Sequence, residues 1–211
     1  MKNKICLILV FLFSFLSGSI NSYGKQDMGI NKLESRINEV SEFSESGVMV
    51  RYETNDSKEK ELNSIKENIS KRYLNDCNSS ENEVGIRTST YNIQAYTWND
   101  NDKTFVELKI INYSKQNSLS NLMKELTELQ TKNIFDIRYF QYIKGKVNNI
   151  DETLDNVKNI QEITNINTLA IHNGYVGTAN IYNGERVNFA VSTYDTGSYL
   201  IIGTPVIFAT Y

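Results

Sequence analysis

The chain is poor in the residues on which metal and cofactor chemistry depends. Its 211 residues include one histidine, one tryptophan, one proline and two cysteines. The histidine, His172, stands directly before an Asn-Gly pair, and neither an HExxH motif nor closely spaced cysteines accompany it. A zinc site needs several such ligands at recognisable spacing. We therefore expect neither a metal ion nor a cofactor.

Cysteine chemistry has little support either. Cys6 lies inside an apolar run near the N-terminus, so Cys77 is the only cysteine in the rest of the chain, and no internal disulfide can form there. A thiol nucleophile needs a neighbouring base or cation, for which His172 and an arginine such as Arg138 or Arg186 are available. Because Cys77 stands in a polar, turn-rich loop that is not typical of a nucleophile, we interpret it as non-catalytic.

Other enzyme motifs are also missing: there is no P-loop, no dinucleotide-binding fingerprint and no nucleophile elbow. Paired carboxylates for sugar hydrolysis have no fixed sequence spacing, so the sequence does not exclude such a pair. The candidate acids are Glu107, Asp136 and Asp195, which lie on or beside expected strands. Exposed acids on strand faces are the simpler interpretation. We predict a protein that is not an enzyme, with a carboxylate-based cell-wall hydrolase as an alternative.

The N-terminus has the pattern of a signal peptide. Lys2 and Lys4 precede an apolar run of about 12 residues, 5–16, whereas a membrane span needs about 20. Ser22 and Gly24 supply the small side chains that signal peptidase requires, which predicts cleavage after Gly24. We therefore expect a secreted, extracytoplasmic domain that is not inserted in the membrane after cleavage.

The charge of the chain argues against a nucleic-acid partner. Cleavage removes Lys2 and Lys4 from the 22 basic residues and none of the 25 acidic residues, so the formal net charge changes from −3 to −5. The basic residues are scattered and often adjoin acids, whereas nucleic-acid binding usually depends on a clustered positive surface. We expect a solvated surface of mixed charge.

Hydrophobic periodicity predicts helices that alternate with strands. Candidate helix caps are Asn31, Ser57 and either Asn117 or Ser118. The expected helices are 31–43, 57–74, one with an apolar stripe over 119–129, and 150–163. The expected strands are 48–53, 86–98, 104–113, 134–143, 168–172, 175–182, 185–194 and 199–211. Turn signals at 173–174, 183–184 and 195–198 predict that the last four strands form an antiparallel meander.

The expected elements also recur in a similar order, which indicates an internal duplication. The segment Val50-Arg51-Tyr52 opens one series and Ile137-Arg138-Tyr139 opens the other. We expect a signal peptide over 1–24, a first α/β repeat over 25–132 and a second β-α-β4 repeat over 133–211. The fold class would be α+β, with duplicated β-α-β units of three or four strands and helices on one side of an antiparallel sheet.

Aromatic residues are the one compositional excess, with 13 tyrosines and 9 phenylalanines. Many fall on expected strands, where tyrosine suits a half-buried position. A sheet covered by helices on one side leaves its other face open, so such residues can also stack on sugars or pack against a protein. The candidates for ligand binding are Trp98, Tyr96, Tyr139, Tyr182 and Tyr194.

The C-terminal meander carries a more specific pattern. The residues in question are Gly177-Thr178-Ala179, Asn183-Gly184 and, above all, Gly203-Thr204-Pro205 followed by apolar residues and Tyr211. This pattern resembles the YwmB family of exported proteins from spore-forming Gram-positive bacteria. The family is often labelled TATA-box binding, and the resemblance implies a fold like the duplicated saddle of TATA-binding protein. It implies no catalytic residues.

These features predict an exported, non-enzymatic binding protein of the bacterial cell envelope. Its partner would be a cell-wall polymer or another exported protein. DNA binding, which the family label suggests, is a further alternative that export and the acidic net charge oppose.

Overall fold

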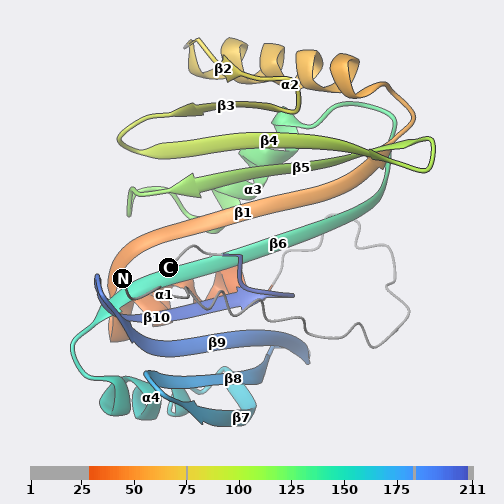
Figure 1. Cartoon of the computed structure of the whole chain (residues 1–211). Helices are drawn as coiled ribbons and strands as arrows, with labels where there is room; N and C mark the ends of the chain where they lie inside the picture. Colours follow the sequence, from red (N-terminus) through yellow and green to blue (C-terminus); the bar gives the residue numbers. More distant parts are fainter. Residues whose placement is uncertain (1–28, 75, 183, 209–211) are drawn as a thin grey trace, which may run out of the picture.

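Four helices and ten strands make up the computed structural model, which describes residues 29–74, 76–182 and 184–208 (Figure 1). The helices are α1 (Ile30–Val40), α2 (Lys58–Tyr73), α3 (Leu119–Leu129) and α4 (Ile150–Lys158). The strands are β1 (Glu42–Thr54), β2 (Asn78–Ser79), β3 (Glu83–Arg87), β4 (Tyr91–Asp100), β5 (Lys103–Asn112), β6 (Ile134–Val147), β7 (Ile163–Ile171), β8 (Gly174–Ile181), β9 (Glu185–Tyr194) and β10 (Gly197–Thr204). The α+β fold class is confirmed.

The expected signal peptide and its cleavage site after Gly24 lie outside the described residues, as do Asn183 and Tyr211. No helix among the described residues is long and apolar enough to cross a bilayer. Export stays a prediction from the sequence.

All ten strands belong to one sheet, in the order β2-β3-β4-β5-β1-β6-β10-β9-β8-β7, and neighbouring strands are antiparallel. The predicted meander is confirmed as β7 to β10. Along the chain, the order α-β-α-β-β-β-β occurs from α1 to β5 and again from α3 to β10. The two first strands, β1 and β6, pair in the middle of the sheet, so the described parts of the two expected repeats share one sheet.

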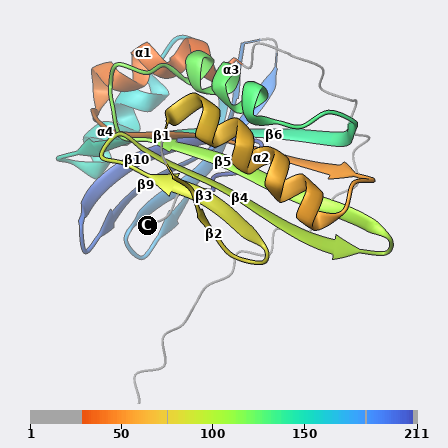
Figure 2. The same ribbon diagram turned by 90° about the horizontal axis from the view of Figure 1, so that it is seen from above.

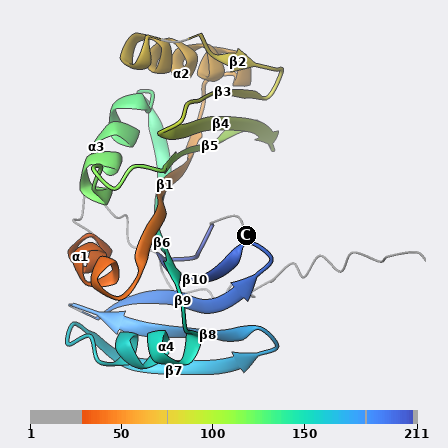
Figure 3. The same ribbon diagram turned by 90° about the vertical axis from the view of Figure 1, so that its left-hand side faces the viewer.

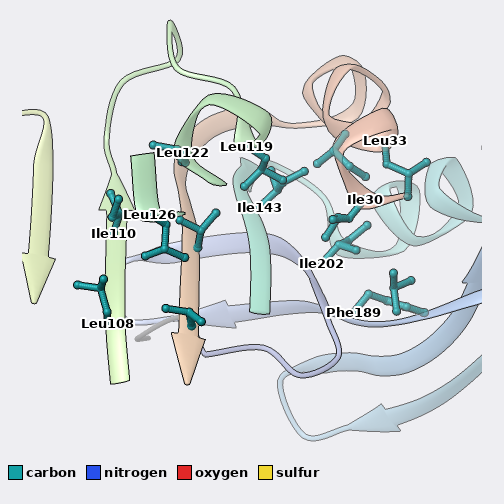
Figure 4. Packing of buried hydrophobic residues seen from close by; sticks show 14 of the residues in the cluster. Ile30, Leu33, Leu108, Ile110, Leu119, Leu122, Leu126, Ile143, Phe189 and Ile202 are labelled. Atoms are coloured by element: carbon teal, nitrogen blue, oxygen red, sulfur yellow. The ribbon is translucent and has the colours of Figure 1, made fainter. Parts of the chain in front are cut away.

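The main core lies between the helices and one face of the sheet. Figure 3 shows α1 and α3 against the middle of that face, with α2 and α4 at its two ends, and Figure 2 shows the same helices from above. Alternate strand residues such as Val48 and Val50 meet the helices and are fully buried. Figure 4 shows the closely packed residues Ile30, Leu33, Leu108, Ile110, Leu119, Leu122, Leu126, Ile143, Phe189 and Ile202.

Side-chain caps fix where three of the helices begin. Ser57, Ser118 and Asn149 each accept a hydrogen bond from the backbone N–H three residues further on, at 3.3, 3.3 and 3.1 Å. The prediction that Asn31 caps the first helix is wrong. Gly29 occupies that position, and its N–H donates to the carboxylate of Glu185, from β9, at 2.6 Å.

Two predicted strand boundaries near turns are wrong. The expected strand 86–98 is two strands, β3 and β4, because the chain turns at residues 88–90. The last strand does not continue to Tyr211 as a ladder, since β10 ends at Thr204 and Pro205 has no N–H to donate.

A further difference affects the last helix and the strand that follows it. The expected helix 150–163 ends at Lys158, and β7 begins at Ile163, before the expected start at Thr168. The intervening polar segment has no strong period of either kind, so the sequence pattern did not indicate where the helix stops.

Candidate functional site

One face of the sheet carries no helix within the described residues, and we call it the open face (Figure 3). In β1, Val48 and Val50 point into the core, so Met49 and Arg51 point to the open face. Residues paired directly across antiparallel strands lie on the same side. The pairing therefore gives rows on the open face: Trp98-Phe105-Glu53-Phe135, Tyr96-Glu107-Arg51-Arg138 and Gln94-Lys109-Met49-Phe140.

Three aromatic side chains stack on the open face, and we call Tyr96, Trp98 and Phe105 the aromatic platform. The Trp98 and Phe105 ring centroids are 5.5 Å apart with planes at 15°, and those of Tyr96 and Trp98 are 5.8 Å apart at 25°. Tyr96 is 46% exposed, and the other two side chains are half-buried. The platform therefore presents aromatic surface that is already ordered.

The β4–β5 hairpin sets the register of this platform. Asp100 pairs with Lys103, which leaves Asn101 and Asp102 as a two-residue loop with φ of 46° and 60°. Positive φ at both loop positions is typical of the tight turns whose twist matches that of paired strands, and Asn and Asp tolerate it. With this turn fixed, Trp98 lies directly opposite Phe105.

Two cations border the platform, and each is paired with an acid. The Lys103 ammonium forms an ion pair with Glu53 and lies 5.2 Å from the ring centroid of Phe135. The Arg51 guanidinium contacts Glu107 at 2.8 Å. Both cationic side chains are about half exposed, at 50% and 52%, so these pairs orient side chains more than they stabilise the fold. The platform region has no surplus of positive charge from these residues.

A cavity of about 370 Å³ adjoins the platform on the β3 side. Its lining includes Glu83, Arg87, Asn92 and Gln94, and Gln94 donates a hydrogen bond to Glu83 at 3.1 Å. Glu83 is the direct partner of Tyr96 in the β3–β4 pair, which places the cavity beside the platform. We call it the polar hollow. Its amide, carboxylate and guanidinium groups offer both hydrogen-bond donors and acceptors.

The C-terminal segment covers part of the other half of the open face. Ile207 and Phe208 pack against Tyr142 and Ile201, which are fully buried, and the Phe208 ring meets the Tyr142 ring edge-on at 4.8 Å. The Tyr142 hydroxyl donates to Glu45 at 2.9 Å, and burial, followed by the Glu45 charge, raises the pKa of Tyr142. The chain itself occupies this region, whereas no described segment covers the platform or the polar hollow.

The structure brings two of the five aromatic candidates together. Tyr96 and Trp98 are neighbours in the platform. Tyr194 also belongs to the open face, but it lies at the end of β9, where its ring centroid is 6.3 Å from that of Tyr199. The sequence reasoning missed Phe105 as a site residue. The signal was present, because the alternation over 104–113 separates Phe105 from the core residues Val106, Leu108 and Ile110.

The other two aromatic candidates do not lie on the open face. Tyr139 pairs with the core residue Val50, packs against the core and exchanges hydrogen bonds with Gln130 at 3.3 Å. Tyr182 lies in the turn after β8 and packs against the same core, with the Lys32 ammonium 5.4 Å from its ring centroid. Both tyrosines therefore have structural contacts on the helix side.

The residues considered for thiol chemistry are not assembled. The Cys77 sulfur lies 3.4 Å from the Ser70 hydroxyl, and the side chain is half-buried against the core. His172 is exposed in the β7–β8 turn, and Arg138 pairs with Asp136 on the exposed start of β6. Among the described residues, no group of three or more His, Cys, Asp or Glu side chains could hold a metal ion.

The three acids considered for hydrolysis are also separate. Glu107 pairs with Arg51, Asp136 pairs with Arg138, and Asp195 is exposed in the β9–β10 turn. A second cavity, of about 440 Å³ between α2 and the β2–β3 pair, has a different set of acids in its lining, namely Glu59, Glu81 and Glu83. All three are exposed.

Comparison of the chain with protein-family models finds no matching family, and comparison with curated proteins finds no matching protein. The functional assignment therefore rests on the geometry of the open face and on the sequence.

Proposed function

We propose that this protein is a non-enzymatic binding module of the bacterial cell envelope, and that its ligand is a carbohydrate polymer of the cell wall. The observation that carries this proposal is the aromatic platform beside the polar hollow. Stacked aromatic faces suit the apolar C–H faces of sugar rings, and convergent polar groups suit their hydroxyls. An ordered platform also lowers the entropy lost on binding.

The extracytoplasmic location is part of the proposal and rests on the N-terminal sequence. A basic start, a short apolar run and small residues at Ser22 and Gly24 support export. We also propose that the chain belongs to the YwmB family, which the Gly203-Thr204-Pro205 segment supports. The repeated element order and the central β1–β6 pair support a duplicated saddle like that of TATA-binding protein.

The saddle does not by itself imply DNA binding, because a fold is shared by proteins of unrelated function. Beside the aromatic platform Arg51 and Lys103 are paired with acids, whereas phosphate contacts need a cluster of unpaired cations. A cell-wall hydrolase is the second candidate. The three acids in the lining of the second cavity, Glu59, Glu81 and Glu83, are the observation that favours it.

The test is co-sedimentation of a chain that begins at Lys25 with purified cell-wall sacculi. This chain keeps every residue that the structure describes. We expect it to sediment with sacculi and expect Trp98→Ala and Tyr96→Ala each to weaken retention about two- to tenfold, since an aromatic stacking contact contributes about 0.5–1.5 kcal/mol. Tyr194→Ala, an aromatic on the open face at the end of β9, is the matched control and should bind normally.

Four outcomes would contradict the proposal. Equal retention of Trp98→Ala and the unchanged chain would remove the platform from the site. Release of soluble sugar fragments from the sacculi would favour the hydrolase. Salt-dependent binding to duplex DNA, measured in parallel, would favour the TATA-binding-like alternative. If neither sacculi nor DNA is bound, an exported protein becomes the partner to seek by crosslinking in cells.

A further inference from the structure

The two edges of the sheet differ greatly in length. At one edge, β2 has two residues and lies close to α2. At the other edge, β7 has nine residues, and no described element lies beyond it (Figure 1). An edge strand presents unpaired N–H and C=O groups along its outer side, and these groups can pair with another strand.

The β7 edge lacks the charged side chains that usually block such pairing. From residue 163 to residue 184, across β7 and β8, the sequence contains no Asp, Glu, Lys or Arg and no Pro. Leu169, near the middle of β7, is 66% exposed, and its neighbours Thr168 and Ala170 are exposed on the opposite face. Charged side chains, proline and bulges are among the common means of protecting an edge, and segment 167–171 of this strand has none of them.

One irregularity limits the usable part of the edge. The β7–β8 register shifts between Thr164 and Asn167, and Asn165 has a φ of 50°. A bulge of this kind twists a strand locally and interrupts its ladder. The regular segment is therefore 167–171, which pairs continuously with β8 and has Leu169 at its centre.

We propose that a second copy of this chain covers the edge, through antiparallel pairing of segment 167–171 of β7 with the same segment of the other copy, about a two-fold axis at Leu169. A two-fold axis perpendicular to a sheet makes the paired edge strands antiparallel, so Leu169 faces its own counterpart while Thr168 faces Ala170 and Asn167 faces Ile171 of the other copy. The two Leu169 side chains then meet and lose their exposure. The chain that begins at Lys25 carries a formal net charge of −5, and an uncharged edge lets two such copies approach without local like-charge repulsion.

This arrangement leaves the aromatic platform and the polar hollow of each copy uncovered. Because the axis is perpendicular to the sheet, both open faces point to the same side, and the aromatic platforms lie towards the outer ends of a continuous sheet. The contact is one strand pair, so we expect an interface below about 1,200 Å², which is typical of weak, reversible association. The inference rests on β7 and does not depend on the proposed ligand.

The first experiment measures mass against concentration, by light scattering and sedimentation equilibrium, on the chain that begins at Lys25. We expect a monomer–dimer equilibrium, and we expect Leu169→Lys and Ala170→Lys to shift it at least tenfold towards monomer. Leu74→Lys is the matched control, because Leu74 is 89% exposed and lies after α2, away from β7. Circular dichroism and thermal unfolding confirm that each variant is folded.

The second experiment places a cysteine on the axis. In a Cys77→Ser background, Leu169→Cys should form a disulfide-linked dimer on mild oxidation, because antiparallel partners are about 4.5–5.5 Å apart between Cα atoms. Leu74→Cys in the same background should not. Monomer at all concentrations, a dimer that both lysine variants leave intact, or growth into fibres instead of closed dimers would each overturn the proposal.

Discussion

Tyr52 and Glu61 form a buried polar contact that one substitution would break. Tyr52 of β1 and Glu61 of α2 are each 1% exposed, and the Tyr52 hydroxyl donates a hydrogen bond to Glu61 Oε1 at 2.7 Å. Thr131 donates to the same oxygen, while Glu61 Oε2 is buried without a hydrogen-bond partner. The carboxylate therefore depends on two protein donors, and because it is buried, water cannot replace a donor that is lost.

Tyr52→Phe removes one of the two donors and leaves the ring in place. A hydrogen bond to a charged group contributes about 1.5–3 kcal/mol, and a buried acceptor left short of donors keeps its desolvation penalty. We therefore expect the free energy of unfolding to fall by about 2 kcal/mol. In a domain of this size the midpoint of thermal unfolding would fall by roughly 4–8 °C.

Urea unfolding followed by circular dichroism measures the change. Tyr96→Phe is the matched control, because Tyr96 is 46% exposed and its hydroxyl has no hydrogen bond within the described residues. We expect the control to differ from the unchanged chain by less than about 0.5 kcal/mol. If Tyr52→Phe loses no more stability than Tyr96→Phe, the reasoning from the buried carboxylate is refuted.

Alkaline unfolding tests the same contact independently. Burial raises the pKa of Tyr52 well above the ordinary value of 10, and the Glu61 charge and hydrogen bond add to the increase. The unfolded tyrosine loses its proton near pH 10 while the native one keeps it, so this stability is fully present below pH 10 and is lost as the pH rises above it. The advantage of the unchanged chain over Tyr52→Phe should therefore shrink above pH 10.

Gly47→Ala would place a methyl group in a clash with Cε1 of the buried Tyr142 ring, so we expect a loss of about 1–3 kcal/mol in urea unfolding; an unchanged midpoint contradicts this. Ser57→Ala should cost about 1 kcal/mol by removing the α2 cap, and Ser57→Asp should restore most of it. Burial raises the pKa of Glu34, which accepts the Leu119 N–H at 3.1 Å. Stability should therefore fall as the pH rises from 4.5 through the higher folded pKa, and equal falls in the unchanged chain and Glu34→Gln between pH 4 and pH 7 would exclude this source.

The order of helices and strands could be predicted from the sequence because it depends on local patterns. Ser57 and Ser118 cap their helices as expected, since a cap needs only a side-chain oxygen three residues before the N–H it accepts. The C-terminal meander was also predictable, because its turn residues separate strands of clear alternation. Exact ends were less certain where a polar segment has no period, as at residues 159–162.

The composition of the aromatic platform was only partly predictable. Alternation alone puts Tyr96 and Trp98 on one face of β4, and the hairpin turn brings Phe105 opposite Trp98. Tyr139 and Tyr182 were included among the candidates because a strand pattern does not state which face the helices cover. For Tyr139 that choice depends on β6 pairing with β1, a strand from the first half of the chain, whereas Tyr182 lies in the turn after β8.

The sequence by itself determined most of the elements of this protein, their order and the absence of familiar catalytic motifs, because these depend on residues close together in the chain. Only the tertiary structure decided that Glu185 accepts a hydrogen bond from Gly29, the residue before α1 and 156 positions away in the chain. The tertiary structure decided as well that Glu61 is buried and that the C-terminal segment covers part of the open face. It also decided that β7 is left at an edge. Each of these outcomes depends on which distant strands become neighbours. Strand pairing satisfies the backbone N–H and C=O groups whatever the side chains are, so no local sequence pattern specifies which strands pair.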